Sequence, residues 1–182
     1  EKFGARFKMD IAIKIEQVEG GFAVNLMSGE KLETKALIVA TGASARWLGI
    51  PSEEKYKGRG VTVCAVCDGA FFKDKEVVVV GGGDSAMEEA LFLTKFVTKV
   101  TIIHRRDQFR ASKIMQDKAH KNEKINFIFD SVVEEVLGDE KKVTGVKLKN
   151  VKTDEMTDFK TDGVFLAIGH VPNTKFLAGF LE

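Results

Sequence analysis

Apolar side chains recur at every second position in two stretches near the start of the chain, residues 11–15 and 22–26. A period of two is typical of β-strands, so each stretch predicts one strand. Glycines at positions 20–21 and the Ser-Gly pair at 28–29 predict turns after them. Residues 36–40 (Ala-Leu-Ile-Val-Ala) form a continuous apolar run, which predicts a strand buried on both faces.

The pattern changes in the middle of the chain. Four valines at 77–80 lead directly into Gly81-Gly82-Gly83, and apolar residues recur at helical spacing over 84–96. Residues 100–103 predict a second apolar strand, and residues 109–121, rich in Lys, Gln and Ala, predict a second helix. Strand, turn, helix and strand within about 30 residues form a βαβ unit, whose strands must be parallel.

The last third repeats the element order of the first. Residues 127–136 and 143–148 predict the strands of a meander, and 163–169 predict a buried strand that ends in Ala-Ile-Gly. The earlier run over 36–42 ends in Ala-Thr-Gly. The repeat indicates two related halves, although two unrelated meanders would give the same pattern.

The repeat also predicts where a first glycine turn belongs. Gly81 precedes Gly169 by 88 residues, and the same interval before Gly42 falls ahead of Glu1. We therefore expect the glycine turn of the first half to lie upstream of this chain. The sequence reads as the end of one dinucleotide-binding domain followed by nearly all of another.

Composition and charge exclude several classes of protein. The 182 residues are 44% hydrophobic, and 28 basic against 27 acidic residues give a net charge of +1. This balance disfavours a nucleic-acid-binding arm or a polyacidic chain. No apolar run reaches the ~18–20 residues of a membrane span, and residues 1–10 lack a signal-peptide pattern. We expect a cytoplasmic protein that binds neither nucleic acid nor membrane.

Gly81, Gly83 and Ala86 fit the pattern G-x-G-x-x-A. The first glycine permits a tight turn, the second lets the backbone approach a pyrophosphate, and the small third residue lets helix and strand pack closely. Backbone N–H groups at the helix start then face the anion. The alternative is a glycine-rich turn that binds no ligand.

An arginine cluster follows the second strand of this unit. His104-Arg105-Arg106 begins 21 residues past Gly83, where an NAD site would place an acidic residue, and Arg110 follows. Guanidinium groups bind phosphate in a bidentate manner, so the cluster predicts a clamp for a 2′-phosphate and NADPH rather than NADH. The alternatives are a solvated basic face and helix-capping charges. Nucleic-acid binding is disfavoured because Asp107 interrupts the cluster.

Cys64 and Cys67, the two cysteines of the chain, form a C-x-x-C motif. A zinc site needs two more ligands, and the three histidines lack zinc-finger spacing, so we expect no metal. A redox dithiol needs only the pair itself. Cysteines at the start of a short helix over residues 68–72 would have a lowered thiol pKa, and Asp68 is placed to exchange a proton with a thiolate. Two buried structural cysteines are the alternative.

The second half closes with the loop Gly169-His170-Val171-Pro172-Asn173-Thr174. Pro172 disfavours a helix at Val171, and loops that leave the carboxyl ends of parallel strands are where such folds place ligands. His170 is accordingly a candidate contact for the cofactor, or else an ordinary polar loop residue.

Four motifs together resemble bacterial-type, low-molecular-weight thioredoxin reductases. They are Cys-Ala-Val-Cys-Asp-Gly at 64–69, Val-Gly-Gly-Gly-Asp-Ser-Ala-Met-Glu-Glu-Ala at 80–90, His-Arg-Arg-Asp-Gln-Phe-Arg-Ala-Ser at 104–112 and Ala-Ile-Gly-His-Val-Pro-Asn-Thr at 167–174. Residues 40–46 fit the domain crossover of that family as well. The resemblance covers essentially the whole chain.

The resemblance implies a flavoprotein in which NADPH reduces FAD, FAD reduces the dithiol pair, and the pair reduces thioredoxin. It also implies a homodimer, and an NADPH domain that rotates to bring nicotinamide and disulfide to the flavin in turn. By motif, Cys64 and Cys67 are the redox pair and Asp68 the acid/base. The nucleotide site would comprise Gly81, Gly82, Gly83, Asp84, Ser85, Ala86, His104, Arg105, Arg106, Arg110, Ile168, Gly169 and His170.

The chain departs from that family in its FAD site, because the family's first G-x-G-x-x-G and its later Gly-Asp segment are absent. The predicted fold is α/β: a Rossmann-like NADPH-binding domain with a β-meander, flanked by a remnant of an FAD-binding domain of the two-domain flavoprotein reductase type. The expected boundaries are 1–45 for the remnant, 46–173 for the NADPH domain, and 174–182 for the return into the FAD domain.

Other functions remain open at this point. A flavoprotein reductase of a peroxiredoxin system also carries C-x-x-C, but it uses NADH, which the arginine cluster disfavours. A stand-alone NADPH-binding module with a dithiol switch is a second alternative, and a zinc-binding interaction domain is a third. We expect this stretch alone to hold FAD weakly and to be inactive.

Overall fold

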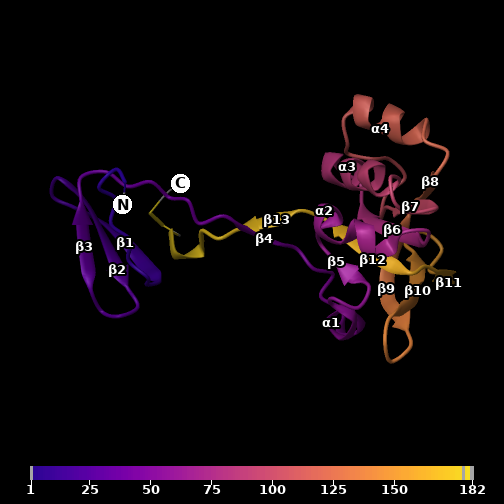
Figure 1. Cartoon of the computed structure of the whole chain (residues 1–182), viewed down its shortest axis with the longest axis horizontal. Coiled ribbons are helices and arrows are strands. Elements are labelled where there is room, and N and C mark those ends of the chain that lie inside the picture. Colours follow the sequence, from indigo (N-terminus) through magenta and orange to yellow (C-terminus); the bar gives the residue numbers. More distant parts are fainter. Residues whose placement is uncertain (1, 178, 181–182) are drawn as a thin grey trace. The chain divides into compact units, whose positions relative to one another are not determined.

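The computed structural model describes residues 2–177 and 179–180. By their internal contacts the residues form two compact units, one of Glu1–Ser44 with His170–Glu182 and the other of Ala45–Gly169. We call them the small unit and the large unit (Figure 1). The assignment of an FAD-domain remnant to 1–45, an NADPH domain to 46–173 and a return segment to 174–182 remains a prediction.

The small unit contains an antiparallel meander, as the alternating residues near the start predict. Its strands are β1 (Ala12–Val18), β2 (Gly21–Leu26) and β3 (Lys31–Thr34), in the order β1-β2-β3. Strand β3 was not expected from the sequence. The short strands β4 (Ala43–Ala45) and β13 (His170–Pro172) pair with each other, and the 3₁₀ turn η2 (Lys175–Leu177) follows. The rings of Phe22 and Phe180 meet edge to face at 5.8 Å.

The prediction of a buried strand over residues 36–40 is wrong. The segment is irregular, and Ile38 is 91% exposed. An apolar strand is stable only when neighbouring strands accept its hydrogen bonds and other layers cover it. Among the residues that the structure describes, no strand pairs with this segment.

The large unit is built around a five-stranded parallel sheet, which confirms the predicted α/β class. Its strand order is β5-β12-β6-β7-β8. The βαβ unit expected from the sequence runs through its centre. The bounds are β5 (Val61–Thr62), β6 (Glu76–Gly81), α3 (Asp84–Leu93), β7 (Lys99–Ile103), α4 (Lys113–His120), β8 (Ile125–Ile128) and β12 (Gly163–Ala167).

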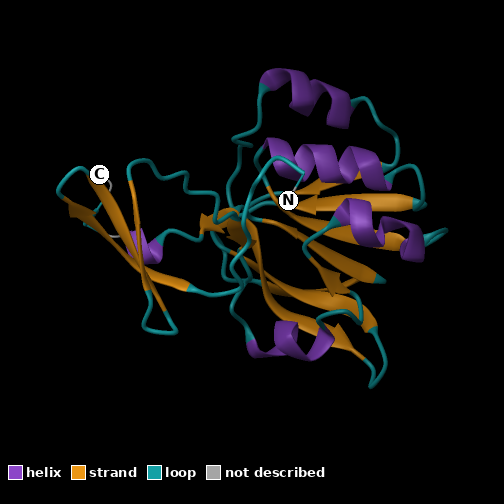
Figure 2. Ribbon diagram, turned by 60° about the vertical axis from the view of Figure 1, so that its left-hand side comes forward, coloured by secondary structure: helices purple, strands orange, loops and turns teal. Residues whose placement is uncertain are grey.

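Two different layers cover this sheet, and alternating valines of β6 face one or the other. Val77 and Val79 pack in the core under α3 and α4, whereas Val78 and Val80 pack in the core shared with the antiparallel sheet β9-β10-β11. Figure 2 shows helices α3 and α4 and this second sheet on opposite sides of the parallel sheet. The remaining elements are β9 (Ser131–Gly138), β10 (Val143–Asn150), β11 (Met156–Lys160), α1 (Pro51–Tyr56), α2 (Ala65–Asp68) and the 3₁₀ turn η1 (Gly69–Phe72).

Two boundaries differ from the sequence-based expectation. The single strand expected over 127–136 is two strands in different sheets, β8 and β9, because the chain turns at Asp130, whose φ is +51°. Asp tolerates this left-handed conformation better than most residues. The helix expected over 109–121 begins only at Lys113, because residues 104–112 form a loop. The N–H groups of Arg110 and Ala111 both bond the carbonyl oxygen of Gly82.

Across the described residues, 2–177 and 179–180, every helix is too short or too polar to cross a membrane.

Candidate functional site

The two cysteines form a disulfide at one end of the large unit's sheet. Cys64 is the N-cap of α2, and its Sγ accepts a hydrogen bond from the N–H of Cys67 at 3.2 Å. Cys64 is half-buried and Cys67 is exposed. The pair is therefore reachable from outside while it stays attached to a packed layer, and Ala65 between the cysteines is buried in the core under α3.

Asp68, the predicted acid/base, is held beside this disulfide by a residue that the sequence analysis did not single out. The hydroxyl of Thr62 donates a hydrogen bond to Oδ2 of Asp68 and accepts one from the N–H of Cys64 at 3.2 Å. The N–H of Asp68 bonds the carbonyl oxygen of Cys64 at 3.1 Å. Thr62 lies on β5, two residues before Cys64. This closeness in sequence is the only feature that could have pointed to its role beside the disulfide.

The glycine turn has the close packing that its motif predicts. A Cβ at Gly81 would lie 2.4 Å from the carbonyl oxygen of Ala167 and 2.9 Å from the Cβ of Ala86. The first and third positions of the motif therefore bring strand β6, helix α3 and strand β12 together. Because β6 and β12 are parallel neighbours with Gly81 opposite Ala167, the residues that follow Ala167, Ile168 and Gly169, start beside the turn.

The next two glycines face different surroundings. A Cβ at Gly82 would lie 2.2 Å from Nδ1 of His104, whereas a Cβ at Gly83 would meet nothing within 4 Å. Gly82 thus makes room for the His104 ring, and Gly83 leaves open space at the start of α3. Asp84 and Ser85 occupy the first two positions of that helix, so their N–H groups have no partner within it.

The arginine cluster lies on a loop that bends back to this turn. Arg105, Arg106 and Arg110 are exposed, and among the ion pairs of the described residues none involves them. The bonds from Arg110 and Ala111 to the Gly82 oxygen, at 2.7 and 3.1 Å, attach the loop to the glycine turn. The structure therefore brings the predicted arginines and the predicted pyrophosphate cradle into one place.

His104 is buried between the turn and the arginines. Its Nε2 lies 3.0 Å from the carbonyl oxygen of Gln108. Burial lowers the pKa of His104 below its usual value, and the neighbouring charges of Arg106 and Arg105 lower it further. The ring is therefore neutral at pH 7, and the positive charge of the site comes from the arginines.

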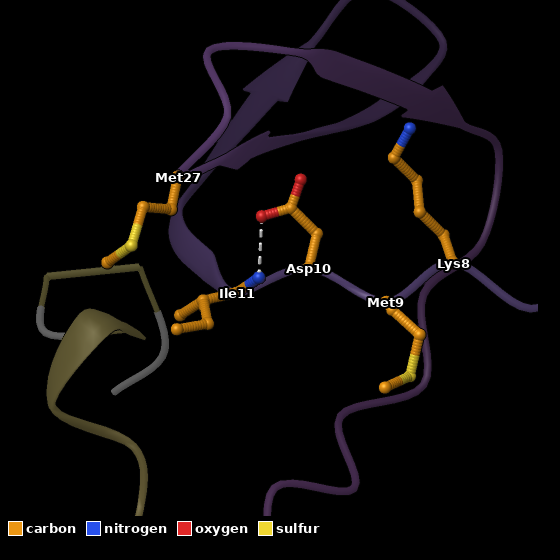
Figure 3. A pocket seen from close by; sticks show the side chains of 5 residues that line it. All are labelled: Lys8, Met9, Asp10, Ile11 and Met27. Carbon is orange, nitrogen blue, oxygen red and sulfur yellow. Dashed lines mark hydrogen bonds between the residues drawn. The ribbon is translucent and has the colours of Figure 1, made fainter.

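His170, the last predicted contact of the nucleotide, is exposed and begins β13 in the small unit. Its role stays a prediction. The structure also shows a hollow in the small unit, lined by Lys8, Met9, Asp10, Ile11 and Met27 (Figure 3). None of the predicted site residues lines it, and the Asp10 carboxylate bonds the N–H of Ile11 at 2.8 Å.

One further titratable residue was not singled out by sequence reasoning. Glu89 on α3 is half-buried, and its Oε2 is buried without a hydrogen-bond partner among the described residues. Burial raises the pKa of Glu89 to about 7. No group of metal-ligating side chains occurs in the part of the chain that the structure describes.

Comparison with known proteins places these features in a family. The profile of the family described as "Pyridine nucleotide-disulphide oxidoreductase" matches residues 4–181. Thioredoxin reductases of Rickettsia conorii and Streptomyces coelicolor are 51% and 48% identical to the chain, over 97% and 100% of its length. The chain spans 57% and 56% of those proteins.

Solved structures agree with the sequence relatives. Thioredoxin reductase of Lactococcus lactis superposes with a TM-score of 0.85 at 49% identity, over 93% of this chain and 56% of that one. The Giardia duodenalis enzyme gives a TM-score of 0.85 at 42% identity, over 95% of this chain and 56% of that one. The resemblance to thioredoxin reductases expected from the four motifs is confirmed. The chain belongs to the pyridine nucleotide-disulphide oxidoreductase family.

Proposed function

We propose that this chain supplies the NADPH-binding unit and the redox-active disulfide of a thioredoxin reductase. In the complete flavoprotein, electrons would pass from NADPH to FAD, then to Cys64–Cys67, and then to the disulfide of thioredoxin. One observation carries the proposal: the large unit holds both a C-x-x-C disulfide and a dinucleotide turn backed by three arginines free of ion pairs with described residues.

The residues present fit NADPH. The open space over Gly83 and the unpartnered N–H groups at the start of α3 suit a pyrophosphate, whose negative charge the helix dipole favours. Arg105, Arg106 and Arg110 suit a 2′-phosphate, and Gly81, Gly82 and Ala86 shape the turn. When bound, NADPH supplies a hydride, which is two electrons and one proton. Asp84, Ser85, Ile168, Gly169 and His170 complete the proposed nucleotide site.

The residues present do not by themselves make an FAD site. In this chain, G-x-G-x-x-A directly after a strand occurs once, at Gly81, beside the arginines. The described part of the small unit offers a meander and short strands, without a second turn of this kind. FAD therefore enters the proposal through the resemblance alone.

The chain's own chemistry lies at the disulfide. Two electrons and two protons convert Cys64–Cys67 to two thiols. One thiolate then attacks a disulfide of the partner and forms a mixed disulfide, and the other thiolate breaks it, so that the partner leaves with two thiols and the Cys64–Cys67 bond returns. Asp68, fixed by Thr62, is placed to take the proton from an attacking thiol and to give one to the departing thiolate.

A protein rather than a small disulfide suits the surroundings of this pair. Val66 and Phe71 are 74% and 75% exposed on either side of Cys67. Exposed apolar side chains beside an exposed redox group give a partner an area to bury. Thioredoxin, which the names of the relatives state as the substrate of those proteins, is the partner we propose.

The test of this function separates two half-reactions in the complete protein. Cys64→Ser and Cys67→Ser should each abolish NADPH-dependent reduction of thioredoxin disulfide and leave NADPH-to-flavin electron transfer intact, which serves as the internal control. Retained disulfide reduction in either variant would contradict the proposal.

The alternative function is a flavoprotein reductase of a peroxiredoxin system, which would use NADH. A direct comparison of NADPH and NADH as electron donors distinguishes the two, because the arginine clamp should favour NADPH. The homodimer implied by the resemblance and the cytoplasmic location expected from the sequence also belong to the proposal. Sedimentation of the complete protein tests the homodimer.

A further inference from the structure

The loop of residues 104–112 carries the arginine cluster, and contacts from several neighbouring elements hold it. The arginine side chains are exposed and make no ion pair with described residues, so their guanidinium groups do not fix the loop. Backbone bonds come from the Gly82 oxygen, from the N–H of Asp130 to the oxygen of Arg106 at 3.2 Å, and from the N–H of Ser131 to the oxygen of His104 at 3.0 Å. Side-chain contacts come from Asp84 on α3, Gln116 on α4 and Lys152 after β10.

The first contact joins the end of the loop to the start of α3. Oδ1 of Asp84 accepts a hydrogen bond from the N–H of Ser112 at 2.7 Å and another from its hydroxyl at 2.9 Å. Ser112 is the N-cap of α4, yet its side chain makes no capping bond to that helix. The hydroxyl is used instead to connect the two helices, which lie side by side over the sheet (Figure 2).

The second contact joins Lys152 to Asp107, in the middle of the loop. Nζ of Lys152 lies 2.9 Å from Oδ2 of Asp130 and 3.4 Å from Oδ2 of Asp107. Asp107 sits between Arg106 and Arg110, where an unpaired carboxylate would repel a phosphate. The hydrogen bond to Asp130 raises the pKa of Lys152, so its ammonium group is charged at neutral pH and lowers the net negative charge of the two carboxylates from −2 to −1.

We propose that Asp84, Ser112 and Lys152 are positioning residues that hold the arginine loop in its nucleotide-binding conformation before NADPH arrives. The inference rests on the proposed function and goes beyond the motif, since Lys152 lies outside every motif of the family resemblance. A loop that samples other conformations weakens apparent affinity in proportion to the population that cannot bind. The contacts at both ends of the clamp keep that population small.

The test measures NADPH and NADH binding directly, by fluorescence titration of the complete protein and of the variants D84A, S112A and K152M. The Asp84–Ser112 bonds are of ordinary length, whereas Lys152 and Asp107 form a longer, exposed ion pair. D84A and S112A should therefore raise the Kd for NADPH by about two- to tenfold, and K152M by about two- to threefold. In S112A and K152M the Kd for NADH, which lacks the 2′-phosphate that the arginines would bind, should stay within about twofold, whereas D84A also alters the proposed pyrophosphate site that both nucleotides share. Asp84→Asn keeps an acceptor for the Ser112 N–H, and should recover most of the affinity lost in D84A.

Lys149→Met is the matched control. Lys149 lies in the same hairpin as Lys152 and pairs with Asp154 instead. Its loss should leave both affinities unchanged. Melting curves establish whether each variant is folded. If D84A does not fold, S112A, which keeps the backbone bond to Asp84, takes its place.

Two outcomes overturn the proposal: NADPH affinity as tight in S112A and K152M as in the parent protein, or equal losses for NADPH and NADH in those two variants. If the parent protein itself fails to prefer NADPH, the proposed function fails instead. In that case, hydrogen exchange at the backbone amides of residues 105–111, measured without nucleotide, tests whether the three side chains hold the loop. Faster exchange in the variants supports the positioning role, and unchanged exchange overturns it.

Discussion

The Thr62 hydroxyl connects the Cys64–Cys67 disulfide to its proposed acid/base: it accepts a hydrogen bond from the N–H of Cys64 and donates one to the carboxylate of Asp68. Because the same oxygen is fixed by both partners, the carboxylate has a set position relative to the first cysteine.

This relationship predicts a graded loss of activity in the complete protein. Asp68→Asn should lower the rate of thioredoxin reduction by about 10²-fold, because general acid–base catalysis contributes that much or more. Thr62→Val keeps the Asp68 carboxylate but removes the hydrogen bond that fixes its position. It should therefore lower the rate of thioredoxin reduction by about tenfold and alter the pH profile of that reaction. Thr62→Ser keeps the hydroxyl and should restore both. The idea is wrong if Thr62→Val behaves like the parent protein at every pH.

Adjacent glycines of the dinucleotide turn should respond oppositely to a methyl group. Gly82→Ala puts a Cβ 2.2 Å from the His104 ring, so it should destabilise the fold by about 1–3 kcal/mol through overpacking. Gly83→Ala meets open space with a φ of −98°, which alanine adopts freely, so stability should change by less than about 0.5 kcal/mol. NADPH affinity should nevertheless fall about tenfold or more, because the backbone must approach the pyrophosphate there.

Thermal melting and NADPH titration of the same two proteins check this contrast. A Gly83→Ala variant that binds NADPH as tightly as the parent protein would remove the turn from the proposed nucleotide site.

The partly buried carboxyl group of Glu89 should make the free energy of unfolding depend on pH. Burial raises the pKa of Glu89 to about 7 in the folded chain from its model-peptide value of 4.5. Between these values the folded state binds more protons than the unfolded state, so stability falls as pH rises through this window. Glu89→Gln removes the titration and should be more stable than the parent at pH 8, by about 1–2 kcal/mol after allowance for solvent screening.

The exposed neighbour Glu88 provides the control, since Glu88→Gln should leave the pH dependence of the melting temperature unchanged. Melts of the three proteins between pH 4 and pH 8 make the comparison. Parallel curves for the parent and Glu89→Gln would contradict the raised pKa.

Removing the exposed ring of Phe71 should weaken the binding of the protein partner without affecting the other steps. The side chain of Phe71 is 75% exposed, four residues after Cys67 in the sequence. Phe71→Ala should raise the KM for thioredoxin by about tenfold, leave kcat within about twofold, and leave NADPH-to-flavin transfer unchanged. Ile114→Ala removes an equally exposed apolar side chain on α4 and should have no effect. An equal KM change in both variants would argue against a docking role for Phe71.

Local periodicity was sufficient for the centre of the fold. The run of valines, the glycine turn and the helical spacing after it predicted β6, α3 and β7, because those elements draw on residues close in sequence. The same pattern placed the arginines near the turn. Elements that depend on distant residues were missed: β3, the split between β8 and β9, and the late start of α4, which the bonds to the Gly82 oxygen delay.

Residues 36–40 show the limit of such reasoning. Their composition fits a buried strand, but a strand also needs partners, and none of the described strands provides one. In the site, the motifs identified the groups of the proposed chemistry, and they include Asp84 and Ser112 without indicating that these two bond each other. Thr62 and Lys152 lie outside every motif, because a hydrogen bond across the fold leaves no periodic trace in the sequence.

The redox pair follows an edge strand of minimal length. Strand β5 pairs with β12 only through Val61 and Thr62, whereas β6 pairs with β12 from Val77 to Gly81. Regions with few backbone pairings open locally at small free-energy cost, while the rest of a domain stays intact. The covalent bond that would break and reform in each cycle of the proposed reaction is thus attached where the backbone can rearrange without disturbing the valine core, so the dithiol and disulfide states can share one folded scaffold.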